Sequence, residues 1–402
     1  MIKLHEAFEI VLQHTPRLEA QRMPLLRARG SVLAEEVASD VDMPPFPRSS
    51  VDGYAVLAAD LRQLPARLQV LGSIAAGTSV AFIISSGQTA KIMTGAPVPE
   101  GADAVQMIER TRAVANTNAV DILEAVASGA NISPRGSEAQ LGQVVAHAGS
   151  FISPMMIGLL AAVGKSEVLA YRAPTVGVIA TGDELVALEE QPRGAQIRNS
   201  NSACLFAQVE TAGARPHLLG IARDHKHALR TLIQQGLQYN MLLLTGGVSM
   251  GDLDLVEDVF VEFGFEIFFN KVAVKPGKPV VFARAGNTLV FGLPGNPVSA
   301  STVFELLVRP SIRKMMGHAA YQNPIVTARL TQRFLNRSGR ENYAPAWTWY
   351  ENGAYHVRPL PSKGSGDVAS YAASNSYLIC PMDRTELSAE EQVQAMLRTE
   401  FF

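Results

Sequence analysis

The spacing of hydrophobic residues changes along the chain, and each change predicts a different kind of structure. In residues 1 to about 40 the apolar positions recur near the helical period of about 3.6 residues, and Pro16 marks a stop. Residues 55–138 hold short apolar runs separated by Gly, Ser and Pro, which predict a small β-rich module. Residues 139–172 return to a helical pattern. The strand-like runs of the β-rich module include Leu68–Leu71 and Ala81–Ile84.

From Thr175 onward strand-like and helix-like segments alternate, which is typical of a mostly parallel sheet with helices on both faces. The expected strands are Thr175–Ala180, Pro216–Ile221, Met241–Leu244, Phe268–Val274 and Leu289–Phe291. The expected helices are Ser202–Ala212 and Asp224–Gln235. After about residue 321 the period shortens again, which predicts a small terminal β-domain. Its expected strands are Ile325–Leu330, Ala344–Tyr350, Tyr355–Pro359 and Ser376–Ile379.

These patterns predict the fold class and a division of the chain into modules. The fold class is α/β with flanking β-rich modules and a mostly parallel central sheet. The expected modules are a discontinuous helical linker domain (1–48 and 139–172), a small β-rich domain (49–138), an α/β domain (173–320) and a C-terminal small β-domain (321–402).

Composition excludes several classes of protein. The 402 residues are 47% apolar and 18% charged, which is ordinary for a globular chain with an ample core. A net charge of -2 without a dense basic block gives no electrostatic footprint for nucleic acid or an anionic membrane. The longest apolar stretch, Phe151–Val163, is too short to span a bilayer. Cys204 and Cys380 match neither a disulfide framework nor a zinc spacing, so we expect a cytoplasmic protein.

Three loops that follow predicted strands indicate a phosphate-bearing ligand. They are Gly246–Asp254, Lys275–Pro279 and Gly292–Pro297. Glycines allow backbone N–H groups to approach an anion that a Cβ atom would exclude, and Lys275 and Lys278 add full charges. The alternative for the two lysines is that they are ordinary surface charges.

Acidic residues follow the same predicted strands and suggest a divalent cation or a reacting water beside the anion. Asp183 and Glu184 follow the Thr175 strand, Asp224 opens a helix, and Asp254 ends the first glycine-rich loop. Ligands of parallel α/β sheets gather where the strands end, so these loops are expected at one edge. The alternatives are solvated turns for Asp183 and Glu184, and helix capping for Asp224 and Asp254.

An ordered set of motifs runs across nearly the whole chain: Pro45-Phe46, Ser49–Ala55, Met93–Pro97, Pro99–Val105, Thr181–Leu185, Gly247–Ser249, Lys275–Pro279 and Leu293–Ser299. This set resembles the MoeA/gephyrin E-domain family, whose members are molybdopterin molybdenumtransferases. The resemblance implies an elongated multi-domain protomer, a central MogA-like α/β domain and a homodimer. It also implies the reaction: adenylylated molybdopterin is bound, molybdate is inserted at its dithiolene, and AMP is released with the finished molybdenum cofactor.

The resemblance implies roles for individual residues. The implied catalytic residues are Asp52, Thr94, Glu184, Asp224 and Asp254. The implied substrate-binding residues are Gly246, Gly247, Ser249, Lys275, Lys278, Pro294, Gly295, Asn296, Pro297 and Ser365. A divalent metal, Mg²⁺, is expected at Glu138, Glu184 and Asp254. Candidate protein partners are the molybdopterin adenylyltransferase and molybdoenzyme chaperones.

Five positions at four places in the chain depart from the family pattern. Val51 replaces a Met, Ser137-Glu138 replaces Glu-Asp, Asn199 replaces an Asp, and Gly366 replaces a His. The departures leave a second interpretation open, in which the chain is a weakly active or non-catalytic paralogue that binds molybdopterin or serves as a scaffold. A molybdopterin adenylyltransferase is a third interpretation, but that related fold lacks the flanking β-modules and the two motifs Lys275–Pro279 and Pro294–Pro297.

Overall fold

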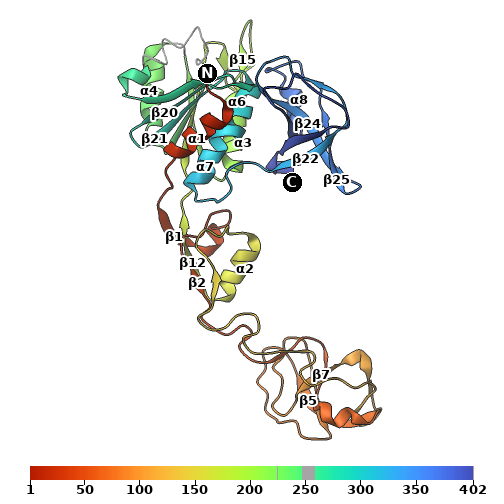
Figure 1. The fold of residues 1–402 in the computed structure, drawn as a ribbon. Coiled ribbons are helices and arrows are strands. Elements are labelled where there is room, and N and C mark those ends of the chain that lie inside the picture. Colours follow the sequence, from red (N-terminus) through yellow and green to blue (C-terminus); the bar gives the residue numbers. More distant parts are fainter. Residues whose placement is uncertain (224, 247–258, 402) are drawn as a thin grey trace. The chain divides into compact units, whose positions relative to one another are not determined.

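The computed structural model describes residues 1–223, 225–246 and 259–401 (Figure 1). Their contacts divide the chain into two compact units. The first unit comprises residues 1–34, 149–153 and 168–402, and the second comprises residues 35–148 and 154–167. Asp224, Gly247, Ser249 and Asp254, which the sequence places in the site, lie outside the described residues. The expected boundaries of four domains stay a prediction.

A six-stranded mixed sheet forms the centre of the first unit (Figure 1). In spatial order its strands are β16 (Arg215–Ala222), β13 (Thr175–Thr181), β17 (Met241–Thr245), β21 (Thr288–Leu293), β20 (Pro279–Ala285) and β18 (Glu266–Lys271). The first four strands run parallel, whereas β20 is antiparallel to both of its neighbours. Every residue of β17 and β21 is buried, as expected for parallel strands covered on both faces. The predicted mostly parallel α/β sheet is therefore confirmed.

Two hydrophobic clusters cover the two faces of this sheet. Met241 and Leu243 of β17 belong to one cluster, and Leu242 and Leu244 belong to the other, because successive strand residues point to opposite faces. The first cluster also contains apolar residues of α1 (Leu4–His14), α3 (Ser200–Thr211), α6 (Pro297–Val303) and α7 (Arg309–Met315). The second contains residues of α4 (Lys226–Gly236). Helices therefore lie on both faces, as the alternating pattern predicts.

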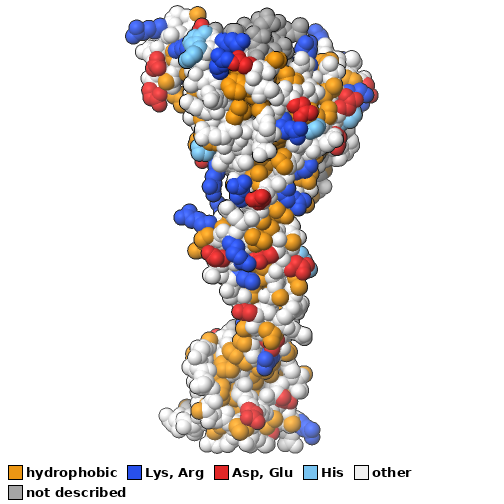
Figure 2. Space-filling model, turned by 90° about the vertical axis from the view of Figure 1, so that its left-hand side faces the viewer, with side chains coloured by type: hydrophobic (Ala, Val, Ile, Leu, Met, Phe, Trp, Pro, Cys, Tyr) orange, Lys and Arg blue, Asp and Glu red, His pale blue; other side chains and the backbone are white. Residues whose placement is uncertain are grey.

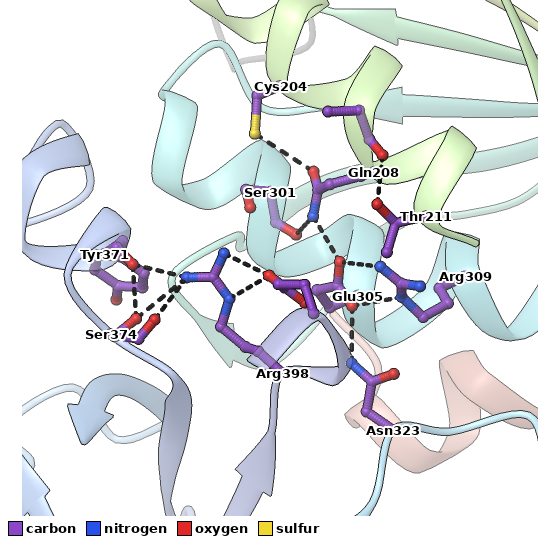
Figure 3. Close-up of polar contacts among 12 residues, drawn as sticks. Cys204, Gln208, Thr211, Ser301, Glu305, Arg309, Asn323, Tyr371, Ser374 and Arg398 are labelled. Atoms are coloured by element: carbon purple, nitrogen blue, oxygen red, sulfur yellow. Dashed lines mark hydrogen bonds and ion pairs between the residues drawn. The ribbon is translucent and has the colours of Figure 1, made fainter. Parts of the chain in front are cut away.

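A buried ion pair joins Glu305, in the π-helical turn Phe304–Val308 between α6 and α7, to Arg309, the first residue of α7 (Figure 3). The Glu305 and Arg309 side chains are 4% and 1% exposed, and Arg309 Nε lies 2.6 Å from Glu305 Oε2. Arg309 Nη2 donates to Glu305 Oε1 at 2.9 Å. Gln208 of α3 and Asn323 donate to the same carboxylate at 2.7 and 2.8 Å. Glu305 therefore connects three segments that are far apart in the sequence.

The terminal β-domain is a second six-stranded sheet in the first unit. In spatial order its strands are β19 (Val274–Lys275), β24 (Glu341–Glu351), β25 (Ala354–Pro359), β22 (Ile325–Leu330), β28 (Gln392–Leu397) and β26 (Ser376–Cys380). The additional pairing of β24 with β26 closes five of these strands into a ring. The four strands predicted from the sequence are all present. Strand β19 joins this sheet through the register pair Lys275 and Asn342.

The second unit contains the predicted small β-rich module. Its six-stranded sheet has the order β7 (Ala104–Met107), β4 (Gly53–Val56), β6 (Gln88–Ile92), β5 (Ala66–Ile74), β9 (Ala119–Ile122) and β8 (Thr111–Ala113). The predicted strand at Leu68–Leu71 lies within β5, but Ala81–Ile84 is not a strand. Its backbone makes only an isolated bond from Ile84 N–H to Glu100 O at 2.8 Å.

The helical interpretation of the N-terminal region is wrong beyond His14. Helix α1 ends at His14, and Pro16 follows it. Residues 20–24 form strand β1 (Ala20–Pro24), which pairs with β12 (Glu167–Tyr171). Within residues 139–172 the single helix is α2 (Pro154–Ala162), all of these residues being described. The apolar residues in these two regions therefore lie partly in short strands, such as β1 and β12, whose partners are distant in the sequence.

No helix in the described ranges is long and apolar enough to cross a membrane. On the face drawn in Figure 2, Lys and Arg side chains are scattered among Asp and Glu side chains. That distribution agrees with the near-neutral net charge of -2.

Candidate functional site

Five connections of the α/β sheet meet at one edge, as the sequence predicts. The parallel strands β13, β16, β17 and β21 all end there. Strand β18 is antiparallel to β20, which is itself antiparallel to β21, so β18 also ends at this edge. The connection 272–278 between β18 and β20 therefore lies beside the loop that follows β21. Ligands of open α/β sheets bind at this kind of edge.

A cavity of about 440 Å³ lies between this edge and the C-terminal sheet, and both of its walls belong to the first unit. Three cationic side chains line it, Lys275, Lys278 and Arg340, and none of the lining residues that the structure describes is acidic. Arg340 Nη1 donates to Val274 O at 3.0 Å, which ties the C-terminal domain to the lysine-bearing turn. The other lining residues are Pro276, Gly277, Pro279, Asn296, Ser299, Phe334, Leu335, Asn342, Ala344, Pro345, Leu360, Ser362, Gly364, Ser365 and Tyr371. This cavity, the lysine cavity, is suited to an anion.

The turn between the two lysines requires glycine at one position. Gly277 has φ +111°, and a Cβ atom there would overlap Val303 Cγ2 of α6. The close approach places the turn directly against α6, and both lysines line the lysine cavity rather than projecting from an isolated surface loop. Among the alternatives for Lys275 and Lys278, this geometry favours ligand binding.

A smaller cavity of about 60 Å³, the glycine-loop cavity, lies at the ends of β13 and β17. Gly246 and Gly295 line it together with Glu184. Gly246 has φ +90°, and a Cβ atom there would lie 2.8 Å from Thr181 Oγ1. Asn201 Nδ2 donates to both Thr245 Oγ1 and Gly295 O at 2.7 Å, which holds two of the loops together. Gly246 therefore allows its loop to pack directly against Thr181 at the wall of this cavity.

The oxygen atoms around the glycine-loop cavity fit a hard cation. Thr181 Oγ1 and Asn201 Oδ1 are buried and have no hydrogen-bond partner among the described residues. The Glu184 carboxylate lines the same cavity, so all three candidate donors are oxygen atoms. Mg²⁺ prefers oxygen ligands and is usually bound by one or two carboxylates together with phosphate oxygens of the substrate. In the described part of the chain no group of three or more His, Cys, Asp or Glu side chains could hold a metal ion by itself. A metal ion bound here would therefore need oxygen atoms of the bound substrate to complete its coordination.

Asp52 and Thr94 are brought together in the second unit. Asp52 Oδ1 accepts hydrogen bonds from Thr94 N–H at 2.7 Å and from Thr94 Oγ1 at 2.9 Å. The backbone bond first, and then the hydroxyl bond, lower the pKa of Asp52. Asp52 is therefore an ionised acceptor whose direction is fixed by Thr94.

Three other expected positions have clear structural surroundings. Glu138 Oε1 pairs with Arg48 Nη2 at 2.6 Å in the second unit, with both side chains at least 40% exposed. Ser365 lines the lysine cavity. Asn199 caps α3 by accepting Ser202 N–H at 3.1 Å, so the helix cap expected at this departure from the family pattern is confirmed.

Helix capping is the alternative for Asp224, which lies outside the described residues, so this alternative stays open. In the described part of α4 the N-cap is His225, whose Nδ1 accepts Ala228 N–H at 3.2 Å. A neutral imidazole nitrogen supplies the same kind of acceptor as a carboxylate oxygen.

Sequence reasoning missed Arg340 and Asn342 as residues of the lysine cavity. They lie more than 60 residues after Lys275 and belong to the C-terminal sheet. The one available signal is a polar Arg340-Glu341-Asn342 run at the start of a strand that is otherwise apolar and aromatic. Such a run is also typical of a solvated strand end.

Comparisons with known proteins cover the whole chain. Residues 2–164 match the family described as MoeA N-terminal region (domain I and II), residues 177–314 match the probable molybdopterin binding domain, and residues 327–397 match the MoeA C-terminal region (domain IV). The chain is 33% identical over 403 residues to the molybdopterin molybdenumtransferase of Bacillus subtilis, covering 98% of this chain and 94% of the relative. It is 32% identical to the protein of the same name from Nostoc, over 98% and 93% of the two chains.

The solved structure of the molybdopterin biosynthesis MoeA protein from Pyrococcus horikoshii is also similar. It has a TM-score of 0.82 and 30% sequence identity to this chain, over 99% of this chain and 100% of the other. Sequence and fold therefore agree over nearly the full length of both chains. The chain belongs to the MoeA family.

Proposed function

We propose that this chain is a molybdopterin molybdenumtransferase, which inserts molybdenum from molybdate into adenylylated molybdopterin and releases AMP. The observation that carries the proposal is the lysine cavity, where three cations and, among the described residues, no carboxylate line a space at the carboxyl edge of the sheet. Molybdate is a tetrahedral dianion, and adenylylated molybdopterin carries a pyrophosphate. Both substrates need the concentrated positive charge that this cavity offers.

Lys275, Lys278 and Arg340 would bind molybdate or phosphate oxygens by charge-assisted hydrogen bonds. At about 4 Å and an effective dielectric near 20, each contact is of order 4 kcal/mol before desolvation. Asn296 and Asn342 also line the cavity and add neutral donors. Ser365 and the backbone of Pro294 and Pro297 would complete the same surface.

The glycine-loop cavity would bind the adenylyl-side phosphate of the pyrophosphate, while the lysine cavity holds the molybdopterin-side phosphate. Gly246 and Gly295 line the glycine-loop cavity, and the family resemblance implies that Gly247 and Ser249, which lie outside the described residues, also bind the substrate. Glu184, Thr181 and Asn201 would hold Mg²⁺ against the phosphates, together with Asp254 and Asp224 as the family resemblance implies. Bound there, Mg²⁺ would supply Lewis-acid stabilisation of the charge that develops as the phosphoanhydride is cleaved.

Asp52 and Thr94 would complete the site from a second protomer. They belong to the second unit, whereas both cavities belong to the first. A two-fold homodimer is the commonest way to build a composite site from two such units. Glu138 would act in the same way, exchanging its Arg48 partner for the metal. Both cysteines are free thiols, which fits a reducing cytoplasm as the place of action.

Reconstitution tests this proposal. Purified protein is mixed with adenylylated molybdopterin, molybdate and magnesium, and the product is tested for its ability to activate a cofactor-free molybdoenzyme. If the protein is a molybdenumtransferase, the reaction yields AMP and active cofactor together. A binding or scaffold protein, the alternative to the enzyme, would bind adenylylated molybdopterin with neither product, and that outcome would overturn the proposed activity.

A further inference from the structure

We propose that Phe334 and Leu335 bind the flat pterin ring of the substrate, while Lys275 and Lys278 hold its anionic end. The inference rests on the proposed function and assigns the orientation of the substrate within the lysine cavity. The two apolar residues form the short strand β23 (Phe334–Leu335) of the C-terminal domain. Neither residue belongs to a motif of the family resemblance.

Side chains of two chemical kinds line the lysine cavity. Lys275 and Lys278 are cationic, whereas Phe334, Leu335 and Leu360 are apolar. Leu335 is 44% exposed, although it is a large aliphatic residue. Small-molecule sites combine an apolar wall with a few placed polar groups, and a pterin with a phosphate side chain has the matching two-part character.

Strand β23 is held in place by its pairing with β27. Phe334 pairs with Leu387 and Leu335 pairs with Glu386 of β27 (Glu386–Leu387). Arg333 Nη2 also bonds Glu386 Oε2 at 2.6 Å. Phe334 packs against the hydrophobic cluster of the C-terminal domain, so its ring is fixed while it lines the lysine cavity. A fixed aromatic surface loses little conformational entropy when it binds a flat ring.

The turn after β23 holds a cation at a set position beside this apolar wall. Asn336 is 1% exposed, accepts Ser338 Oγ at 2.6 Å and donates to Arg340 O at 2.9 Å. Arg340 in turn bonds Val274 O at 3.0 Å. The guanidinium is planar and stacks on conjugated rings, as Lys does not. The short segment from Phe334 to Arg340 therefore presents an apolar surface and a planar cation to the same cavity.

The competing explanation is that Phe334, Leu335 and Leu360 are simply the surface of the C-terminal hydrophobic cluster. Phe334 contacts that cluster, but Leu335 is not among the residues that form it or pack against it. A substitution of Leu335 should therefore change ligand binding without a large change in the stability of the C-terminal domain. Ile325 of β22 is a matched control, since it is 46% exposed and does not line the lysine cavity.

The first test measures binding of pterin-6-carboxylate, a fluorescent pterin with one anionic group, by fluorescence titration. We expect Leu335→Ala to raise its Kd about tenfold, with Leu335→Met and Ile325→Ala within about twofold of wild type. Phe334→Leu keeps an apolar side chain but removes the aromatic face, and we expect a Kd about fivefold higher. Equal affinities in Leu335→Ala and wild type, or no saturable binding to wild type, would overturn the inference.

The second test separates this inference from the proposed function. Inorganic pyrophosphate, which has no ring, should bind Leu335→Ala and wild type equally and should bind Lys275→Ala more weakly. With adenylylated molybdopterin, Leu335→Ala should raise the KM for AMP release while kcat changes less than twofold. If wild type releases AMP and Leu335→Ala has the same KM, the ring assignment is wrong and the transferase stands. If wild type releases no AMP, the transferase itself fails.

Discussion

The substitution Arg309→Met tests how much of the first unit's stability depends on the buried ion pair of Figure 3. The Arg309 side chain is 1% exposed and makes two short bonds to Glu305, at 2.6 and 2.9 Å. Methionine fills much of the same volume but leaves the Glu305 carboxylate buried with only Gln208 and Asn323 as donors. We therefore expect a large loss of stability from the uncompensated charge.

The expected loss is about 3 to 5 kcal/mol, the usual cost of removing one partner from a buried pair. The first unit is large, so its urea m-value should be about 3 kcal/mol/M or more, and the unfolding midpoint should fall by about 1 to 1.7 M. The double variant Glu305→Gln/Arg309→Met removes the orphaned charge and should recover more than about 1 kcal/mol of that loss.

Urea unfolding followed by circular dichroism measures these shifts. Arg358→Met is the matched control, because Arg358 is exposed on β25 of the same unit. We expect the control to stay within about 0.5 kcal/mol of wild type. The reasoning is refuted if Arg309→Met and Arg358→Met unfold at the same urea concentration, because the pair would then contribute no more than a surface charge.

The same pair predicts a dependence on pH. Burial raises the pKa of Glu305. The hydrogen bonds from Arg309, Gln208 and Asn323 lower the pKa by more than burial raises it, so the pKa lies below its ordinary value. A carboxyl group with a lowered folded-state pKa stabilises the fold above its unfolded-state pKa of about 4.3, and that contribution is lost as the pH falls through the folded-state pKa. The stability gap between wild type and Arg309→Met should therefore narrow below about pH 4. A gap that stays constant from pH 7 to pH 3 would contradict the proposed charge effect.

Three further predictions concern the site. Lys275→Ala should weaken binding of adenylylated molybdopterin in a titration at matched salt while the unfolding midpoint stays near wild type, and an unchanged affinity would reject its role. Glu184→Ala should lower the rate of AMP release at least about tenfold, equivalent to about 1.4 kcal/mol of transition-state stabilisation, and an unchanged rate would remove it from the metal site. Asp52→Ala and Asp254→Ala proteins, each nearly inactive, should recover up to about a quarter of wild-type activity after subunit exchange, since about half of random dimers are hybrids with one intact site. Exchange confirmed by mass without recovered activity would place both residues in one protomer's site.

The sequence predicts the parts of the fold whose structure depends on local pattern. Strands β17 and β21 are short, wholly buried apolar runs followed by glycine-rich loops, and such runs indicate covered parallel strands. The four predicted strands of the C-terminal domain are also local patterns of apolar and aromatic residues. The lysines and glycines of the site follow these strands directly, so their gathering at one edge was predictable.

Features that depend on distant partners were not predictable. Strand β1 is stabilised by β12, more than 140 residues later, and no periodicity in residues 20–24 reveals that pairing. Glu305 and Arg309 have the four-residue spacing of an ordinary surface pair on a helix, yet both are buried by α3 and the segment around Asn323. Arg340 reaches the site because the C-terminal sheet pairs with β19, a contact that only the folded chain defines.

The most direct test of the proposed function is the dependence of AMP release on molybdate. Wild-type protein, adenylylated molybdopterin and magnesium are incubated with increasing molybdate, and AMP is quantified by chromatography. We predict that AMP appears with saturating dependence on molybdate and in equal amount to the molybdenum retained in the product, and that Lys275→Ala requires a higher molybdate concentration. AMP release that is absent, or that proceeds at the same rate without molybdate, would contradict a molybdenum-inserting transferase.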